Sequence, residues 1–191
     1  IIYFKSKDML YKKKFEKKIN MLIKNKHLNK YALFSSVVPK YHYLLKNLLK
    51  KKYSIKLFDI KDKLINKIVS LKIKNKNQVG SDRIANAVGV YKKYKKDCIV
   101  LDFGTATTFD VVYKNGSYNG GIIAPGIKIS LNTLSEKASL IPKIDLKNVK
   151  KVIGADTTTA VRSGFLWGYA GLIDNIVKLI KKETRKSFKV I

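Results

Sequence analysis

Apolar residues recur along the chain at two kinds of spacing, and the spacing predicts where helices and strands lie. Separations of three and four residues place apolar side chains on one face of a helix, whereas short apolar runs bounded by turn-forming residues predict strands. The predicted helices cover residues 8–26, 39–51, 81–96, 126–138 and 156–182. The predicted strands cover residues 1–4, 31–38, 54–58, 68–73, 98–102, 107–113 and 117–123.

The order of these elements predicts the class of fold. Asn115-Gly116 separates the last two strands, and an Asn-Gly pair between strands is a strong signal for a hairpin. Helices and strands are otherwise mixed, which favours an α/β fold over an all-β fold. Residues 188–191 resemble the opening of a strand with nothing to pair with, and the chain starts at Ile1 without a Met. We therefore expect a chain that is truncated at both ends.

Composition excludes several classes of protein. With 46% hydrophobic and 10% aromatic residues, the chain has a core to bury and is not a disordered basic tail. One cysteine, Cys98, excludes a disulfide framework and a multi-cysteine zinc site. No apolar run approaches the roughly 20 residues of a membrane span, and no signal peptide is evident. We expect a cytoplasmic protein with no membrane partner.

Positive charge is concentrated in the first part of the chain. The sequence has 41 Lys and Arg against 13 Asp and Glu, a formal net charge of +28. Residues 1–80 contain 22 Lys and 4 acidic residues, whereas residues 98–145 contain 4 Lys and 4 acidic residues. Only three of the basic residues are Arg, the side chain that specific phosphate and base recognition favours. The pattern indicates compositional drift toward Lys and no specific nucleic-acid site, although such a charge attracts polyanions non-specifically.

Two segments carry candidate chemistry. Leu101-Asp-Phe-Gly-Thr-Ala-Thr-Thr-Phe-Asp110 has an acid at a strand end before a small, hydroxyl-rich turn. Such a turn brings backbone N–H groups and Thr hydroxyls to a phosphate while the carboxylate faces a cation; the alternative is a Thr-rich turn with incidental acids. Gly80-Ser-Asp-Arg-Ile-Ala-Asn86 begins a predicted helix, where Asp82 and Arg83 would be a base and a cation near an anion site. Helix capping is the alternative there. A third candidate is Thr157, which begins a predicted helix and would either offer its hydroxyl to a ligand or cap that helix.

Taken together and in this order, these segments resemble the type III pantothenate kinase family. The match runs over nearly the whole chain and implies an actin-like, RNase H-like two-lobed kinase fold of the acetate and sugar kinase/Hsc70/actin superfamily, with mixed sheets flanked by helices. Residues 1–96 would be the remainder of the N-terminal lobe and residues 97–191 the C-terminal lobe. The matching pieces are Ser35-Ser-Val-Val-Pro39, Gly80-Ser-Asp-Arg83 with Asn86 and Gly89, residues 102–110, Gly120-Gly121 through Pro125-Gly126, Ile153-Gly154 with Thr157, Ser163-Gly164 and Gly168.

The resemblance also implies an activity and the residues that perform it. The family phosphorylates pantothenate with ATP in the first step of coenzyme A biosynthesis, usually as a homodimer. Asp82 would be the general base for the pantothenate hydroxyl. Asp102 would hold a monovalent cation, K⁺ or NH₄⁺, and Mg²⁺ would bridge the ATP phosphates. Pantothenate would be bound by Gly80, Ser81, Asp82, Arg83 and Thr157, and ATP by Gly104 and Thr105.

The sequence departs from the family at several points. An Asp-x-Gly-Asn-Thr phosphate-binding turn and a late Thr-Gly-Gly segment are missing, so we expect the parent protein to be active and these 191 residues alone to be inactive. Ser81 replaces the usual Ala, and Ile73 and Lys76 stand near a usual Tyr and Pro. A kinase-like regulator of the Bvg accessory factor type and a basic nucleic-acid-binding protein are the alternatives. Retention of Asp82, Arg83 and Asp102 argues against a catalytically dead copy.

Overall fold

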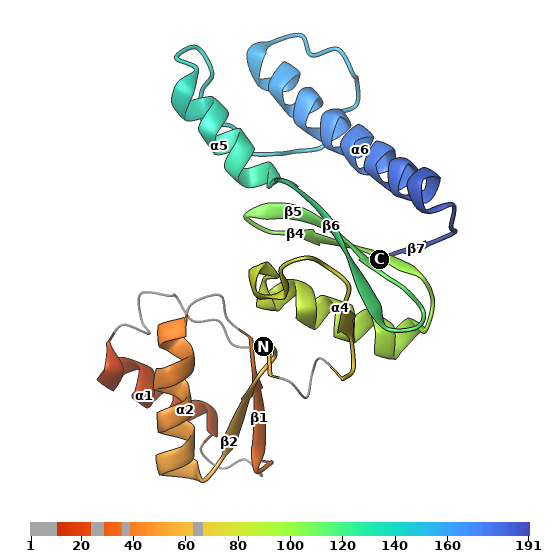
Figure 1. The fold of residues 1–191 in the computed structure, drawn as a ribbon. Coiled ribbons are helices and arrows are strands. Elements are labelled where there is room, and N and C mark those ends of the chain that lie inside the picture. Colours follow the sequence, from red (N-terminus) through yellow and green to blue (C-terminus); the bar gives the residue numbers. More distant parts are fainter. Residues whose placement is uncertain (1–10, 24–28, 36–38, 63–66) are drawn as a thin grey trace. The chain divides into compact units, whose positions relative to one another are not determined.

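A computed structural model describes residues 11–23, 29–35, 39–62 and 67–191 (Figure 1). The predicted strand at residues 1–4 lies outside these ranges, as do the ends of the predicted helix 8–26 and strand 31–38. The chain divides into two compact units. The first unit consists of Ile1–Ile68 and Asn77–Ala85, and the second of Val69–Lys76 and Asn86–Ile191.

The first unit is a small α/β layer. Its helices are α1 (Lys12–Ile23) and α2 (Pro39–Tyr53), and its strands are β1 (Tyr31–Phe34) and β2 (Lys56–Asp59). The two strands are parallel, in the register Tyr31↔Lys56 to Phe34↔Asp59. Leu49, Ile55 and Leu57 are buried at the contact between helix and sheet, where Ile19 and Ile23 of α1 also pack. Apolar residues that the helical spacing placed on one face of each helix therefore do pack into the core of this unit.

The second unit contains a mixed five-stranded sheet in the order β3-β6-β5-β4-β7. β4 (Cys98–Phe103), β5 (Ala106–Val112) and β6 (Ser117–Pro125) are successive antiparallel strands, and β5 and β6 form the predicted hairpin. The outer strands β3 (Ser70–Leu71) and β7 (Lys189–Val190) are parallel to their neighbours. The mixed α/β class is confirmed. The unit's helices are α5 (Ile127–Lys137), α6 (Thr157–Thr184) and part of α4 (Ser81–Tyr94), which begins in the first unit; a 3-10 turn, η2 (Lys76–Gln78), was not predicted.

The end of the chain does have a strand partner, so the expectation of an unpaired strand was wrong. Lys189 and Val190 pair in parallel with Cys98 and Ile99 of β4. The backbone N–H of Leu101 donates to the carbonyl of Ile191 at 2.8 Å and continues the ladder. This partner lies some ninety positions earlier in the sequence, and local patterns of hydrophobicity do not carry such pairings.

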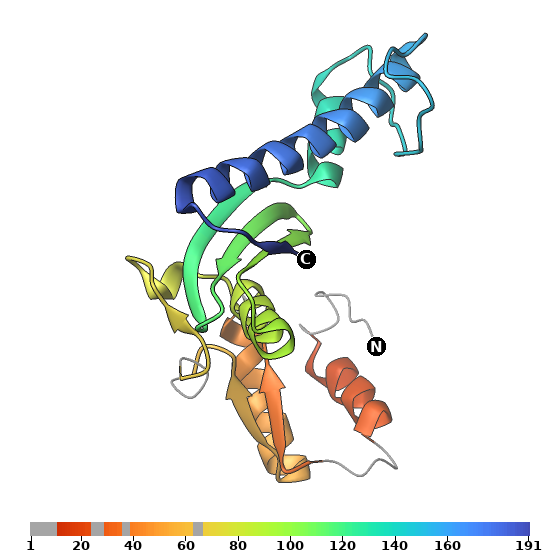
Figure 2. The ribbon, with the colours of Figure 1, turned by 90° about the vertical axis from the view of Figure 1, so that its right-hand side faces the viewer.

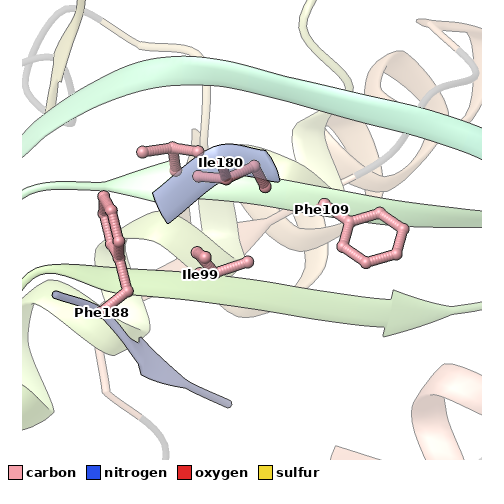
Figure 3. Close-up of a cluster of buried hydrophobic side chains, with 5 residues drawn as sticks. Ile99, Phe109, Ile180 and Phe188 are labelled. Carbon is pink, nitrogen blue, oxygen red and sulfur yellow. The ribbon is translucent and has the colours of Figure 1, made fainter. Parts of the chain in front are cut away.

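The two faces of this sheet differ in character. α6 covers one face and the second-unit part of α4 lies on the other, as Figures 1 and 2 both show. On the α6 face, Ile99, Phe109 and Phe188 pack with Ile180 of α6 (Figure 3). Side chains alternate between faces along a strand, so Cys98, Val100 and Asp102 of β4 point to the α4 face.

Within the described ranges, no helix is both long and apolar enough to cross a membrane.

Candidate active site

Asp102 lies near the end of β4 on the α4 face of the sheet, half-buried. Its Oδ2 accepts a hydrogen bond of 2.9 Å from the side-chain amide of Asn86 on α4. The helix therefore fixes the orientation of the carboxylate and leaves its second oxygen for other contacts. Asp102 was predicted from the sequence, whereas Asn86 had no predicted role, because the contact of a helix with a strand leaves no local signal in the sequence.

The turn after Asp102 is tight and leaves its side chains in the open. The N–H of Gly104 donates to the carbonyl of Ala106 at 2.9 Å, which closes the turn between β4 and β5. Gly104 and Thr105 are both exposed. The N–H of Gly126, before α5, donates to the carbonyl of Thr105 at 3.1 Å, and a Cβ at Gly126 would overlap the carbonyl oxygens of Gly104 and Thr105. Gly126 therefore lies directly against the turn and holds the Thr105 carbonyl in place.

A buried polar network lies next to Asp102 on the same face. Asp110 is fully buried, and its Oδ1 accepts a hydrogen bond of 2.7 Å from the hydroxyl of Tyr118 on β6. Thr108, which is the cross-strand partner of Asp102, donates more weakly to Oδ2 of Asp110 at 3.4 Å. The predicted segment thus contains one accessible acid and one buried acid. The two-residue period of a strand predicts that Thr108 and Asp110 share one face of β5. The contact of Tyr118 with Asp110 could be predicted only if the register of β6 against β5 were known.

The other predicted cluster forms the first turn of α4, in the first unit. Ser81 is buried, whereas Asp82 is exposed and its Oδ1 accepts the N–H of Arg83 at 2.8 Å. A Cβ at Gly80 would overlap Oδ1 of Asp82, so the glycine makes room for this carboxylate. Oδ1 is thus engaged within the turn, and Oδ2 is the oxygen that can accept a proton from a ligand. The turn therefore presents an oriented carboxylate, with Asn86 one helical turn further along α4.

Thr157 is the first residue of α6, and it does not cap that helix. The cap is Asp156, whose carboxylate accepts the N–H of Thr159 at 2.8 Å, while the backbone N–H of Asp156 donates to the Thr159 hydroxyl oxygen at 3.1 Å. These hydrogen bonds, chiefly the one from the backbone of Thr159, hold the pKa of Asp156 below its ordinary value near 3.8. The capping interpretation of Thr157 was therefore wrong, and its exposed side chain is left at the helix end.

The structure brings together part of the predicted site. Asp102, Gly104 and Thr105 belong to one strand-turn-strand of the second unit, and Thr157 lies elsewhere in that unit, at the start of α6. Gly80, Ser81, Asp82 and Arg83 belong together in the first turn of α4. Among the residues that the structure describes, no three His, Cys, Asp or Glu side chains gather in one place.

Comparisons with known proteins agree with this set of features. The family model for type III pantothenate kinase matches residues 3–179. The chain is 56% identical to the type III pantothenate kinase of Pelagibacter ubique over 91% of its own length and 68% of that protein, and 49% identical to that of Desulfosudis oleivorans over 64% and 49%. It is 42% identical to that of Paramagnetospirillum magneticum over 80% of its length and 58% of that protein.

A solved structure supports the fold alone. A putative Baf family transcriptional activator from Campylobacter jejuni superimposes with a TM-score of 0.50 at 22% identity, covering 90% of this chain and 70% of that one. The chain spans between about half and two thirds of the curated relatives named above. A family model that matches almost the whole chain, together with these identities, leads to one conclusion: this chain belongs to the type III pantothenate kinase family.

Proposed function

We propose that the intact protein transfers the γ-phosphate of ATP to the primary hydroxyl of pantothenate and so forms 4′-phosphopantothenate, at the start of coenzyme A biosynthesis. The observation that carries the proposal is the 56% identity with the type III pantothenate kinase of Pelagibacter ubique. The oriented Asp82 and Asp102 carboxylates supply the acid groups that such a transfer needs. Phosphoryl transfer depends mainly on positioning and charge neutralisation, and both clusters are built for positioning.

Asp82 is the proposed general base. Its Oδ1 is held by the N–H of Arg83, so Oδ2 is the atom that would accept the proton as the hydroxyl oxygen attacks the phosphate. Gly80, Ser81 and Arg83 would line the pantothenate site with it, and the exposed Thr157 would add a contact. The start of a helix favours anions, which suits the negatively charged substrates on both sides of the reaction.

The turn after β4 is the proposed ATP contact. Gly104 and Thr105 are exposed, and backbone hydrogen bonds to Ala106 and Gly126 fix the conformation of the turn. A phosphate could therefore approach the turn and the Thr105 hydroxyl without a change of backbone conformation. Asp102 beside them offers carboxylate oxygen, a donor that fits a hard cation such as K⁺ or NH₄⁺. A bound cation would neutralise charge on the transferring phosphate, and Mg²⁺ would reach the site on ATP itself.

The proposal extends to the fold and the assembly. The mixed sheet with helices on both faces supports an actin-like, RNase H-like kinase fold. Lobes at residues 1–96 and 97–191 remain part of the proposal, although the second compact unit also takes in residues 69–76 and 86–96. A homodimer in the cytosol is part of the proposal because the family resemblance implies it. Exposed apolar side chains of the second unit, such as Ile153 at 87% and Trp167 at 49%, are available for such an interface.

The test is ATP-dependent phosphorylation of pantothenate by the full-length protein. We expect Asp82→Asn to lower kcat by roughly 10²- to 10⁴-fold, the usual contribution of a positioned base. Asp174→Asn, which changes an exposed carboxylate on α6, is the matched control and should keep full activity. A wild-type rate in Asp82→Asn would remove Asp82 as the base. Absence of any transfer by the wild-type protein would favour the regulator alternative.

A further inference from the structure

We propose that Ile123 is a specificity-determining residue of this kinase, and that its side chain packs against the two methyl groups next to the hydroxyl of pantothenate that is phosphorylated. The inference rests on the proposed function and deepens it. It concerns the Gly120–Gly126 segment, whose glycines are part of the family resemblance but whose apolar residues have no role so far.

The register of the sheet places Ile123 in one row with the proposed cation ligand. Asp102 pairs with Thr108 across β4 and β5, and Thr108 pairs with Ile123 across β5 and β6. Directly paired residues of antiparallel strands project to the same face. The three side chains therefore stand side by side on the α4 face, the face on which Asn86 contacts Asp102.

The row changes in chemistry from one end to the other. It begins with a carboxylate, passes a hydroxyl and ends with an aliphatic side chain that is 63% exposed. The next row beneath it is closed, because it contains the buried Asp110 opposite Gly121 and the Tyr118 hydroxyl that bonds to Asp110. The row of Asp102 is thus the border between the buried network and the open part of this face. Ile123 is its one apolar member.

The dimensions of the row suit the reacting end of pantothenate. Adjacent strands are about 4.8 Å apart, so Ile123 is roughly 10 Å from Asp102 across two strand spacings. If the transferring phosphate lies beside Asp102 and Thr105, the accepting hydroxyl must meet it there. The hydroxyl is carried by a CH₂ group, and the carbon next to that group bears two methyl groups, which would then lie toward the aliphatic end of the row. An exposed β-branched side chain is an apolar wall for such a group.

The neighbouring residue offers a matched control. Ile122 pairs with Phe109, so its side chain lies on the opposite, α6 face of the sheet, 37% exposed. A substitution at Ile122 removes the same number of carbon atoms from the same strand without touching the proposed wall. A difference in substrate preference between the two variants is therefore due to the face of the sheet on which the side chain lies, because both variants lose a β-branched residue from β6.

The experiment measures kcat and KM of the full-length protein for pantothenate and for N-(2,4-dihydroxybutanoyl)-β-alanine, which lacks both methyl groups. We expect Ile123→Ala to lower kcat/KM for pantothenate roughly 10-fold, mainly through KM, since leaving one methyl group in water instead of burying it weakens binding about four-fold. The analogue should be affected little, so the wild-type preference for pantothenate should collapse. Ile123→Val should keep most of the preference, and Ile122→Ala all of it.

Two results would overturn the inference, and they are distinguishable. If Ile123→Ala is active and keeps the wild-type preference for pantothenate over the analogue, Ile123 does not contact the methyl groups, although the proposed function stands. If the wild-type protein phosphorylates neither compound, the proposed function fails and the inference falls with it. An equal loss of preference in Ile122→Ala would also refute the inference, because the effect would not depend on the face.

Discussion

Replacing Tyr118 with Phe removes one oxygen atom from the interior of the second unit. That oxygen donates a hydrogen bond of 2.7 Å to Oδ1 of Asp110. Tyr118 is 1% exposed and Asp110 is 0% exposed, so water cannot replace the donor without a rearrangement. The phenylalanine ring fills the same space, and the change therefore isolates the hydrogen bond from the packing.

The expected cost follows from this geometry. A hydrogen bond to a carboxylate is worth about 1.5–3 kcal/mol, and Tyr118→Phe removes one such bond from a buried carboxylate. The Thr108 hydroxyl also donates to Asp110, but at 3.4 Å it compensates little. We expect Tyr118→Phe to lower the free energy of unfolding by about 2 kcal/mol. For the whole 191-residue chain that corresponds to a fall in Tm of roughly 4–8 °C.

Trp167 provides the signal for the assay. It is the chain's single tryptophan and lies on α6, which belongs to the same unit as Tyr118. Denaturant unfolding followed by its fluorescence therefore reports that unit. Tyr113→Phe is the control, because the Tyr113 ring is half-buried and stacks on Phe188, and removal of its hydroxyl should cost less than about 0.5 kcal/mol. If the two variants unfold at the same denaturant concentration, the hydrogen bond does not stabilise the fold.

Two further predictions concern a turn and a helix end. Gly126→Ala forces a Cβ onto the carbonyls of Gly104 and Thr105, so we expect a loss of about 1–3 kcal/mol in denaturant unfolding. Gly164→Ala on α6, with open space around it, should instead be neutral or stabilising, and equal losses in both would contradict the argument. Because the pKa of Asp156 is lowered in the folded state, its capping contribution is present above about pH 4 and lost as the pH falls through the folded pKa. Amide exchange at Thr159 should therefore separate wild type from Asp156→Ala at pH 6, and the gap should narrow as the pH is lowered further below 4; a gap that does not change with pH would refute the cap.

Features with a local cause were predictable from the sequence. The apolar run at residues 98–102 and the Asn115-Gly116 turn predicted β4 and the hairpin of β5 and β6, because each depends on neighbouring residues alone. The capping of α6 was also within reach. Asp156 is followed three positions later by Thr159, the spacing of a capping box, whereas Thr157 has Ala160 at that distance.

Features that depend on register were not predictable in this way. The pairing of β5 with β6 shifts between Asp110 and Val112, where Gly120 adopts a positive φ of 88°. This irregularity decides that Tyr118, and not a neighbour, reaches Asp110. The contact of Asn86 with Asp102 likewise depends on how α4 lies on the sheet, and the pairing of β7 with β4 joins distant parts of the chain. The hydrogen bonds of the buried network could therefore not be predicted from the sequence, although Thr108 and Asp110 lie inside a predicted motif.

The large positive charge and the candidate chemistry depend on different residues. Exposed lysines such as Lys46, Lys50 and Lys51 lie on α2, whereas the turn proposed to meet ATP contains no lysine. That turn offers the exposed hydroxyl of Thr105 and a carboxylate that Asn86 orients, while its Gly104 N–H is bonded to the Ala106 carbonyl. Fixed donors discriminate between ligands, whereas a diffuse field of +28 only raises the rate at which any polyanion arrives. The net charge therefore argues for faster encounter with anionic substrates, and the site's selectivity has to come from the geometry of β4, β5 and β6.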